Sequence, residues 1–274
     1  MPELPEVETV RRGLSNYFAN EKIVSVQILY RKLLLGDPEK FIQQVTGSVV
    51  RQVDRRGKFL LLRLDNQQTI ISHMRMEGRY AIEDDSAQPR KHTEAIFKLA
   101  NGSQIFYDDT RKFGKMQLVA TGQETKEVRS LATMGPEPTE TTLTLNYLFA
   151  RLQKSKKAIK GWLLDQNNLA GLGNIYADEV LWMSKISPLR PACEISRPEA
   201  EVLRENIIHE LAFAIDQGGS TVHSFIDASG HAGHMQDKLH AYGRVGQPCQ
   251  RDGHELIKIK VAQRGTTYCP HCQK

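Results

Sequence analysis

Residues 58–76 read KFLLLRLDNQQTIISHMRM, two short apolar runs joined by the polar residues 65–68. This pattern is typical of two antiparallel strands connected by a turn. Four more runs of the same kind lie on either side, namely IVSVQILY at 23–30, EAIFKLA at 94–100, QIFYDD at 104–109 and KMQLVA at 115–120. Six short strands at this spacing predict an antiparallel β-sandwich or barrel rather than alternating strands and helices.

Helical patterns lie on both sides of this β region. Before it, apolar residues recur at helical spacing and predict an amphipathic helix over residues 6–18. After it, a polar linker is expected at 121–142, followed by helices over 143–152, 157–166, 175–186 and 196–217 and a β pattern near the end. We therefore expect an α+β multidomain fold. It would combine a helix and an antiparallel β-sandwich over 1–134, a helical domain over 135–237 and a β-hairpin finger over 238–274.

The composition excludes several classes of protein. Apolar residues make up 40% of the 274 residues and charged residues 25%, which fits a folded protein and not a disordered or fibrous one. No stretch approaches the roughly 18 consecutive apolar residues that a membrane helix needs. The first ten residues contain acids where a secretion signal would contain Lys or Arg. We therefore expect a cytoplasmic protein that has no membrane partner.

Positive charge is concentrated at the carboxyl end of the chain. The formal net charge is +5, and residues 236–274 contain seven Lys or Arg against three acidic residues. Neutralisation of backbone phosphates requires a local basic surface of this kind. The distribution indicates a nucleic acid as the partner.

Three of the four cysteines also lie near the carboxyl end. Cys249, Cys269 and Cys272 fit the zinc-ribbon spacing C-x2-C-x16-C-x2-C, except that Asp252 stands where the second cysteine is expected. Zinc accepts carboxylate oxygen and imidazole nitrogen as well as thiolate sulfur. The sequence therefore predicts one structural zinc ion held by the three cysteines and Asp252, with His254 as the alternative fourth ligand.

The amino-terminal residues Pro2 and Glu3 fit nucleophilic chemistry. Methionine before proline is usually removed in bacteria, which would leave Pro2 as a secondary amine. An α-amino group has a pKa of about 8, against about 10.4 for lysine, so near neutral pH it is more often unprotonated and nucleophilic. Such an amine can attack a sugar C1′ and form an iminium, with Glu3 placed to transfer the proton.

Other motifs fit contact with nucleic acid. Segments 73–76 (HMRM) and 109–114 (DTRKFG) each place a bulky apolar side chain beside a cation near a loop, which suits insertion into a base stack. RRGK at 55–58 forms a basic turn, and a second basic run at 154–160 leads into a helix. GLGNIY at 171–176 joins two helices through a glycine turn whose backbone N–H groups suit a phosphate. These motifs predict phosphate and base contacts from several parts of the chain.

Together these segments resemble the formamidopyrimidine-DNA glycosylases, bacterial enzymes of base-excision repair. PELPEVETV, RRGK, SHMRMEG, DDTRKFG, GPEP, AGLGNIYADEVLW and VAQRGTTYCPHCQ occur in the family's order from residue 2 to residue 273. The resemblance implies an N-terminal helix and β-sandwich, a helix-two-turns-helix domain and a β-hairpin zinc finger. It also implies a glycosylase that excises 8-oxoguanine and formamidopyrimidines from duplex DNA, and a lyase that cleaves the abasic strand by β,δ-elimination.

The resemblance also implies roles for individual residues. Pro2 corresponds to the Schiff-base nucleophile and Glu3 to the general acid. Lys58 takes part in proton transfer and phosphate contact, and Arg264 clamps phosphates and assists elimination. The remaining residues are expected to contact the DNA (His73, His92, Arg111, Lys156, Asn174), to enter the base stack (Met76, Arg111, Phe113) and to form a lesion-capping loop (Gly218, Gly219, Ser220, Thr221).

Two other functions remain open on the sequence. A noncatalytic protein that binds damaged DNA would share the DNA contacts, although it has no need of an amine nucleophile beside an acid. A lyase with little base specificity is also compatible, because the shape of a base pocket cannot be read from sequence. In each case we expect a monomer that binds damaged duplex DNA.

Overall fold

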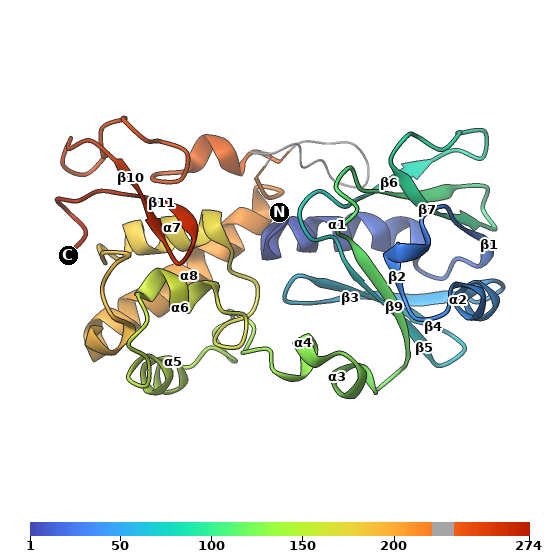
Figure 1. Ribbon diagram of the computed structural model, residues 1–274, viewed down its shortest axis with the longest axis horizontal. Helices are drawn as coiled ribbons and strands as arrows, with labels where there is room; N and C mark the ends of the chain where they lie inside the picture. Colours follow the sequence, from blue (N-terminus) through green and yellow to red (C-terminus); the bar gives the residue numbers. More distant parts are fainter. Residues whose placement is uncertain (221–232) are drawn as a thin grey trace. The chain divides into compact units, whose positions relative to one another are not determined.

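The computed structural model describes residues 1–220 and 233–274, and the chain divides into two compact units. Unit 1 comprises Met1–Thr133 with the described part of Gln217–His234, and unit 2 comprises Met134–Asp216 and Met235–Lys274. Figure 1 shows the elements of both units. Thr221, one of the residues expected in a lesion-capping loop, lies outside the described residues. The domain ranges expected from sequence stay predictions.

Two β-sheets form most of unit 1 (Figure 1). One has the strand order β2-β9-β5-β4-β3, with strands at Leu34–Leu35, Lys115–Ala120, Gln68–His73, Phe59–Leu64 and Val50–Arg56. The other has the order β1-β7-β8-β6, with strands at Ile23–Ile28, Thr93–Leu99, Gln104–Asp108 and Arg79–Glu83. Neighbouring strands are antiparallel in both sheets, apart from the short parallel pair of β2 and β9.

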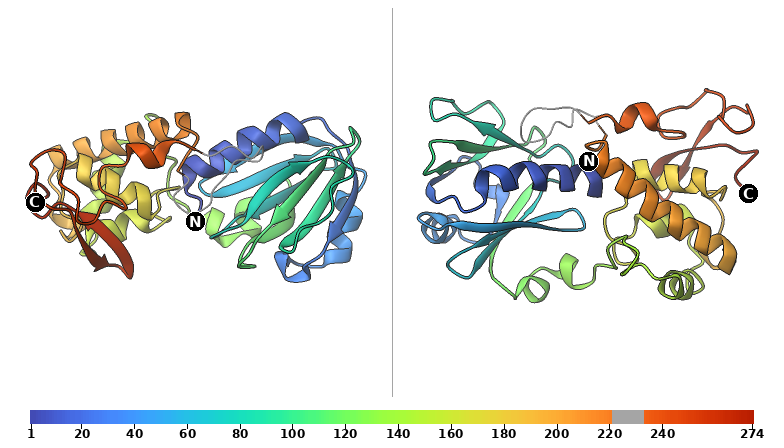
Figure 2. Two further views of the ribbon diagram at one scale, coloured as in Figure 1. Left: turned by 90° about the horizontal axis from the view of Figure 1, so that it is seen from above. Right: turned by 180° about the vertical axis from the view of Figure 1, so that it is seen from behind.

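Helix α1 (Leu4–Phe18) shares one apolar core with the two sheets. Its buried residues Val10 and Leu14 lie in the same cluster as Leu60 of β4 and Phe97 of β7. Each such side chain contributes about 1.5–3 kcal/mol when it is fully buried. The helix packs against β3, as the views in Figure 2 show. This packing places the first residues of the chain at one end of the β3–β4 hairpin.

The structure confirms the six strands expected from sequence and adds elements that the apolar pattern did not predict. Strands β3 and β6 pair with predicted strands, and helix α2 spans Pro38–Val45. Asp37 caps α2, since its carboxylate accepts a hydrogen bond from the Glu39 N–H at 2.9 Å. The Asp-Pro pair was therefore a usable helix-start signal. Within the expected linker, two short helices span Glu124–Glu127 (α3) and Arg129–Ala132 (α4).

Unit 2 combines helices with a C-terminal hairpin. Its elements are α5 (Leu145–Leu152), α6 (Ile159–Leu164), α7 (Asn174–Met183), η2 (Ala192–Glu194), α8 (Arg197–Asp216), η3 (Met235–Lys238), β10 (Ile257–Val261) and β11 (Arg264–Tyr268). Helix α7 is buried along most of its length. Its Glu179 carboxylate accepts the N–H groups of residues 240–242 at 2.7–2.9 Å and so anchors the segment that leads to the hairpin.

Within the described residues, every helix falls short of the length and apolar character needed to cross a membrane.

Candidate functional site

The amino terminus lies in a cluster of ionisable side chains. Burial lowers the pKa of the Met1 amine from its ordinary value, against the opposing effects of Glu3 and Glu6, and the charge of Lys58 lowers it further. Glu3 is the N-cap of α1, and its N–H donates to Glu6 Oε2 at 2.8 Å. With Met1 in place, the Pro2 nitrogen belongs to an amide. Removal of Met1 would therefore create an amine next to these acids and Lys58.

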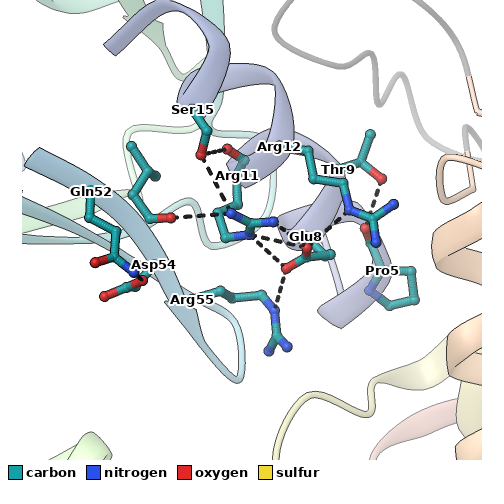
Figure 3. A network of polar contacts seen from close by, with 10 residues as sticks. Pro5, Glu8, Thr9, Arg11, Arg12, Ser15, Gln52, Asp54 and Arg55 are labelled. Atoms are coloured by element: carbon teal, nitrogen blue, oxygen red, sulfur yellow. Dashed lines mark hydrogen bonds and ion pairs between the residues drawn. The ribbon is translucent and has the colours of Figure 1, made fainter. Parts of the chain in front are cut away.

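A network of charged side chains holds the β3–β4 hairpin against α1, as Figure 3 shows. Glu8 accepts hydrogen bonds from Arg11 Nη2 at 2.8 Å and from Arg55 Nε at 3.1 Å. Arg55 also donates to the carbonyl of Gly57 at 3.0 Å, in the turn that leads to Lys58. Burial would raise the pKa of Glu8, but the two arginines outweigh it and the pKa is lowered. The network thus helps to place the buried Lys58 near the amino terminus.

Glu6 connects the amino terminus to the start of the expected lesion-capping loop. Its Oε1 accepts the N–H of Ser220 at 2.7 Å. A Cβ added at Gly219 would lie 2.9 Å from the same oxygen, and both Gly218 and Gly219 have positive φ values, 74° and 78°. Sequence reasoning did not single out Glu6. Its position three residues after an N-cap, which is typical of a capping box, was the available signal.

The side chains expected to enter a base stack lie on two neighbouring loops, called here the 74–78 loop and the 109–114 loop. The first runs from β5 to β6 and the second from β8 to β9, so each loop passes from one sheet to the other. Met76 is 37% exposed and Phe113 is 47% exposed. The Arg111 guanidinium lies 4.9 Å from the centroid of the Phe113 ring. Two apolar side chains and one cation are thus presented to solvent on this face of unit 1.

His73 and His92 lie beside these loops. His73 Nδ1 accepts the Arg75 N–H at 2.9 Å, which places the ring proton on Nε2. Burial, together with Arg75 and Lys58, lowers the pKa of His73 to about 3. This histidine can therefore donate one hydrogen bond to a phosphate but carries no charge at neutral pH. The carbonyl of His92 accepts the Asp109 N–H at 2.9 Å, at the start of the 109–114 loop.

In unit 2, Arg264 stands exposed at the start of β11, after the two-residue turn 262–263. Both turn residues have positive φ, 48° and 61°, although neither is glycine. The adjacent Gly265 carbonyl accepts hydrogen bonds from Lys160 Nζ and Asn174 Nδ2, each at 3.0 Å. Asn174 is therefore held at the hairpin turn that presents Arg264.

A buried ion pair supports this turn. Lys160 Nζ lies 2.6 Å from Asp178 Oδ1, with the two side chains 0% and 1% exposed. Asp178 Oδ2 accepts the Thr267 N–H at 3.0 Å, so the pair joins α6 and α7 to β11. Burial raises the pKa of Asp178 to about 7, although Lys160 acts in the opposite direction. Sequence reasoning missed Asp178, and it placed Lys160 in the basic run 154–160 expected to contact phosphate, whereas the structure buries Lys160 in this ion pair. Lys156 is exposed before α6.

Four side chains around the base of the hairpin could hold a metal ion, since their ligand atoms all lie within 4.8 Å of one another: Cys249, Asp252, Cys269 and Cys272. Three sulfur atoms and one carboxylate fit a tetrahedral zinc ion. His254 forms a second candidate set with Asp252 and His271. His271 Nδ1 lies 2.9 Å from Asp252 Oδ2. The structure thus groups Asp252 both with the three cysteines and with the two histidines.

The expected site residues are divided between the two units. Unit 1 contains the amino-terminal cluster, Lys58, both histidines and the insertion loops. Unit 2 contains Arg264, Asn174, Lys156 and the metal-binding set.

Three models of known protein families match successive parts of the chain. The family model for the formamidopyrimidine-DNA glycosylase N-terminal domain matches residues 1–116, and the model for the H2TH domain of these enzymes matches residues 134–226. A model for the zinc finger found in FPG and IleRS matches residues 246–274.

Similar proteins and structures cover nearly the full length. The formamidopyrimidine-DNA glycosylase of Lactiplantibacillus plantarum is 52% identical over 98% of both chains, and that of Ligilactobacillus salivarius is 50% identical over 100% of this chain and 99% of the other. A Lactococcus lactis FPG mutant bound to DNA containing Fapy-dG is 40% identical, with a TM-score of 0.95 over 100% of both chains. The L. lactis Fpg bound to DNA with an abasic site has a TM-score of 0.94 at 40% identity over 99% of both. The chain therefore belongs to the formamidopyrimidine-DNA glycosylase family.

Proposed function

We propose that this protein is a bifunctional DNA glycosylase and AP lyase that excises 8-oxoguanine and formamidopyrimidines from duplex DNA. The observation that carries the proposal is the cluster of Glu3, Glu6 and Lys58 around the amino terminus, since it surrounds the position of an N-terminal amine nucleophile. Family membership supports the same chemistry, because similar proteins are described in complex with DNA that contains Fapy-dG, an abasic site or carbocyclic 8-oxo-G.

The proposed reaction begins after removal of Met1. The Pro2 nitrogen attacks C1′ of the damaged nucleotide, the bond from C1′ to the base breaks, and the base leaves with a proton. Glu3 transfers protons during ring opening and iminium formation. The iminium then makes the neighbouring sugar proton acidic, so that elimination breaks the strand on the 3′ side and afterwards on the 5′ side. Lys58 and Arg264 hold the phosphates and assist proton transfer in these steps.

The proposed DNA contacts come from both units. Met76, Arg111 and Phe113 fill the space left by the extruded nucleotide. His73, His92, Arg111, Lys156 and Asn174 contact the backbone, and Gly218, Gly219, Ser220 and Thr221 belong to a loop that covers the flipped base. Exposure of the insertion side chains supports this assignment. The protein would act as a monomer in the bacterial cytoplasm.

We further propose that the zinc finger uses Asp252 as its fourth ligand beside Cys249, Cys269 and Cys272. The grouping of these four side chains supports the choice over His254. The ion would be structural and would fix the base of the hairpin that carries Arg264. The Asp252→Cys variant should then retain zinc more strongly against a chelator, whereas His254→Ala should retain it as the wild type does. If His254→Ala lost zinc instead, His254 and not Asp252 would be the fourth ligand.

Borohydride trapping on an 8-oxoguanine duplex tests the proposed function. We expect a covalent adduct at Pro2, shown by peptide mapping, and an intact mass that lacks Met1. Glu3→Gln should lose base excision but keep duplex binding, which depends mainly on phosphate contacts. Binding without any adduct or excision would instead identify a noncatalytic DNA-binding protein. Trapping on abasic DNA with no preference for 8-oxoguanine would identify a lyase of low base specificity.

A further inference from the structure

The Tyr107 hydroxyl lies between the ends of the two insertion loops. Tyr107 is 0% exposed, and its hydroxyl has no hydrogen-bond partner among the described residues. A Cβ added at Gly78 would lie 2.1 Å from this oxygen, and one added at Gly114 would lie 1.8 Å from it. Neither glycine has a positive φ, so both positions require space and not an unusual backbone conformation. The phenol thus occupies the room that two side chains would otherwise fill.

Asp109 organises the 109–114 loop from inside. It is fully buried, and its Oδ1 accepts the Arg111 N–H at 2.9 Å. Its Oδ2 accepts the N–H groups of Phe113 and Gly114 at 2.9 and 2.8 Å. Hydrogen bonds from backbone N–H groups to a carboxylate are among the strong ones in proteins. These hydrogen bonds lie on both sides of Lys112, whose φ is 58°, and so fix the backbone of Arg111 and Phe113.

The two loops are also joined directly. The Thr110 hydroxyl donates to the Glu77 carboxylate, and the Gly78 N–H closes the 74–78 loop by donating to the Met74 carbonyl at 3.0 Å. At their ends, β5 pairs with β9 and β6 pairs with β8, so neighbouring strands begin and end both loops. The loops are therefore supported from the sheets, from the phenol and from each other.

We propose that Tyr107 and Asp109 are positioning residues that hold the two loops as one support, so that Met76, Arg111 and Phe113 enter the duplex together. This inference rests on the proposed function. Ordering side chains and loops during binding costs free energy, and loops that are ordered beforehand avoid part of that cost. The support keeps Met76 and Phe113 directed into solvent before DNA binds.

A double-mutant cycle tests Asp109. Asp109→Asn keeps the size of the side chain but replaces one acceptor oxygen by a donor, so loop N–H groups lose their partner. We expect about ten-fold weaker binding to a duplex with a non-hydrolysable 8-oxoguanine analogue, and a smaller loss with undamaged duplex, where only the backbone contact of Arg111 is affected. In the Phe113→Ala background the same substitution should have less effect, because part of its effect acts through the Phe113 side chain. Fully additive effects, or an equal loss with undamaged DNA, would overturn the proposal.

Tyr107→Phe and Tyr80→Phe form a matched pair that separates positioning from stability. Tyr80 is also buried and packs edge-to-face on Tyr107 at 5.1 Å, but its hydroxyl donates to Ser72 Oγ at 2.6 Å. Tyr107→Phe removes no hydrogen bond to a described residue, so it should keep the melting temperature. It does remove the oxygen that fills the space between Gly78 and Gly114, so it should weaken lesion binding several-fold. Tyr80→Phe should lower the melting temperature and leave lesion binding unchanged. The same response in both variants would overturn the role of Tyr107.

The two proposals fail in distinguishable ways. If the wild-type protein is trapped through Pro2 while the cycle is additive, the chemistry stands and the positioning role is wrong. If the wild-type protein is not trapped, the proposed function fails, and the binding cycle still decides what Tyr107 and Asp109 do.

Discussion

The 109–114 loop of unit 1 and the hairpin turn 262–265 of unit 2 each present an arginine that we propose contacts DNA, but they are held differently. In the loop, one buried carboxylate accepts three backbone N–H groups from the loop itself. In the turn, the support comes from other elements, since Lys160 reaches the Gly265 carbonyl and Asp178 accepts the Thr267 N–H. Both segments contain non-glycine residues with positive φ.

The difference follows from how each segment is anchored. Strands of two sheets hold both ends of the 109–114 loop, so a side chain within the loop is sufficient to order it. The hairpin depends on its two strands, a metal-binding base and side chains from α6 and α7. Substitutions far from the turn in sequence should therefore disturb its conformation, whereas the conformation of the loop should depend mainly on Asp109 at its start.

Removal of zinc should have the largest effect and should affect only the hairpin. Structural zinc contributes about 10–16 kcal/mol in zinc-finger peptides, and a site with a carboxylate in place of a thiolate is weaker. After chelation we expect loss of the Arg264 contribution to DNA binding and an unchanged melting transition of unit 1. Metal content, calorimetry and binding of Arg264→Ala with and without chelator check this. A zinc-free protein in which Arg264→Ala still weakens binding fully would show that the hairpin holds its shape by packing.

Lys160→Met should be the next most damaging change. It leaves Asp178 buried without its cation, which typically costs about 3–5 kcal/mol. Lys157→Met is the matched control, because Lys157 makes an exposed ion pair with Asp165 at 3.5 Å and such pairs contribute about 0–1 kcal/mol. Thermal unfolding measures both variants. Equal melting temperatures for the two would mean that the buried pair does not support the turn.

The division into β-rich and helical parts could be predicted from the sequence, because strand and helix periodicities are local properties. It also allowed individual reactive residues to be predicted, from the Met-Pro start and from the spacing of the cysteines, and the roles of these residues stay predictions. Asp109 and Lys160 were not singled out for their supporting contacts. Those contacts depend on which backbone atoms the fold brings to each side chain, and one charged residue among apolar neighbours does not specify that.

Salt dependence should distinguish charged from neutral phosphate contacts. Arg264→Ala should reduce the slope of log affinity against log salt by about one unit for each phosphate that the arginine neutralises in the wild type. His73→Gln should weaken binding without changing the slope, because a histidine whose pKa is about 3 releases no counterion at neutral pH. Titrations at several salt concentrations measure both slopes. A reduced slope for His73→Gln would show that this side chain becomes charged when DNA binds.

The smallest effect is expected at Glu94, a buried residue of β7 close to the 109–114 loop. Burial and the charge of Asp109 raise its pKa to about 7, against the effects of Lys112 and Lys115. Between the unfolded value of 4.5 and about 7, the folded state keeps the proton that the unfolded state loses, so stability falls as pH rises through this window. Glu94→Gln removes this loss. Its melting temperature should exceed that of the wild type at pH 8, by about 2–4 °C for each 1 kcal/mol that the ionisation of Glu94 costs the folded state, and by less at pH 5.

The exposed Glu39 provides the control for this measurement. Glu39→Gln should leave the pH dependence of the melting temperature as it is in the wild type. A gain for Glu94→Gln that is the same at pH 5 and pH 8 would show that ionisation of Glu94 does not lower stability.

Because of where the two tryptophans lie, tryptophan fluorescence reports on the hairpin region and not on unit 1. Trp162 and Trp182 both belong to unit 2. The Trp182 indole N–H donates to Cys249 Sγ at 3.4 Å, its ring stacks on His240, and the Arg251 guanidinium lies 3.9 Å from it. Emission excited at the red edge of the absorption band should therefore change when the sulfur binds or releases a metal ion. Movements of the insertion loops will need an introduced fluorophore, either on the protein or in the DNA.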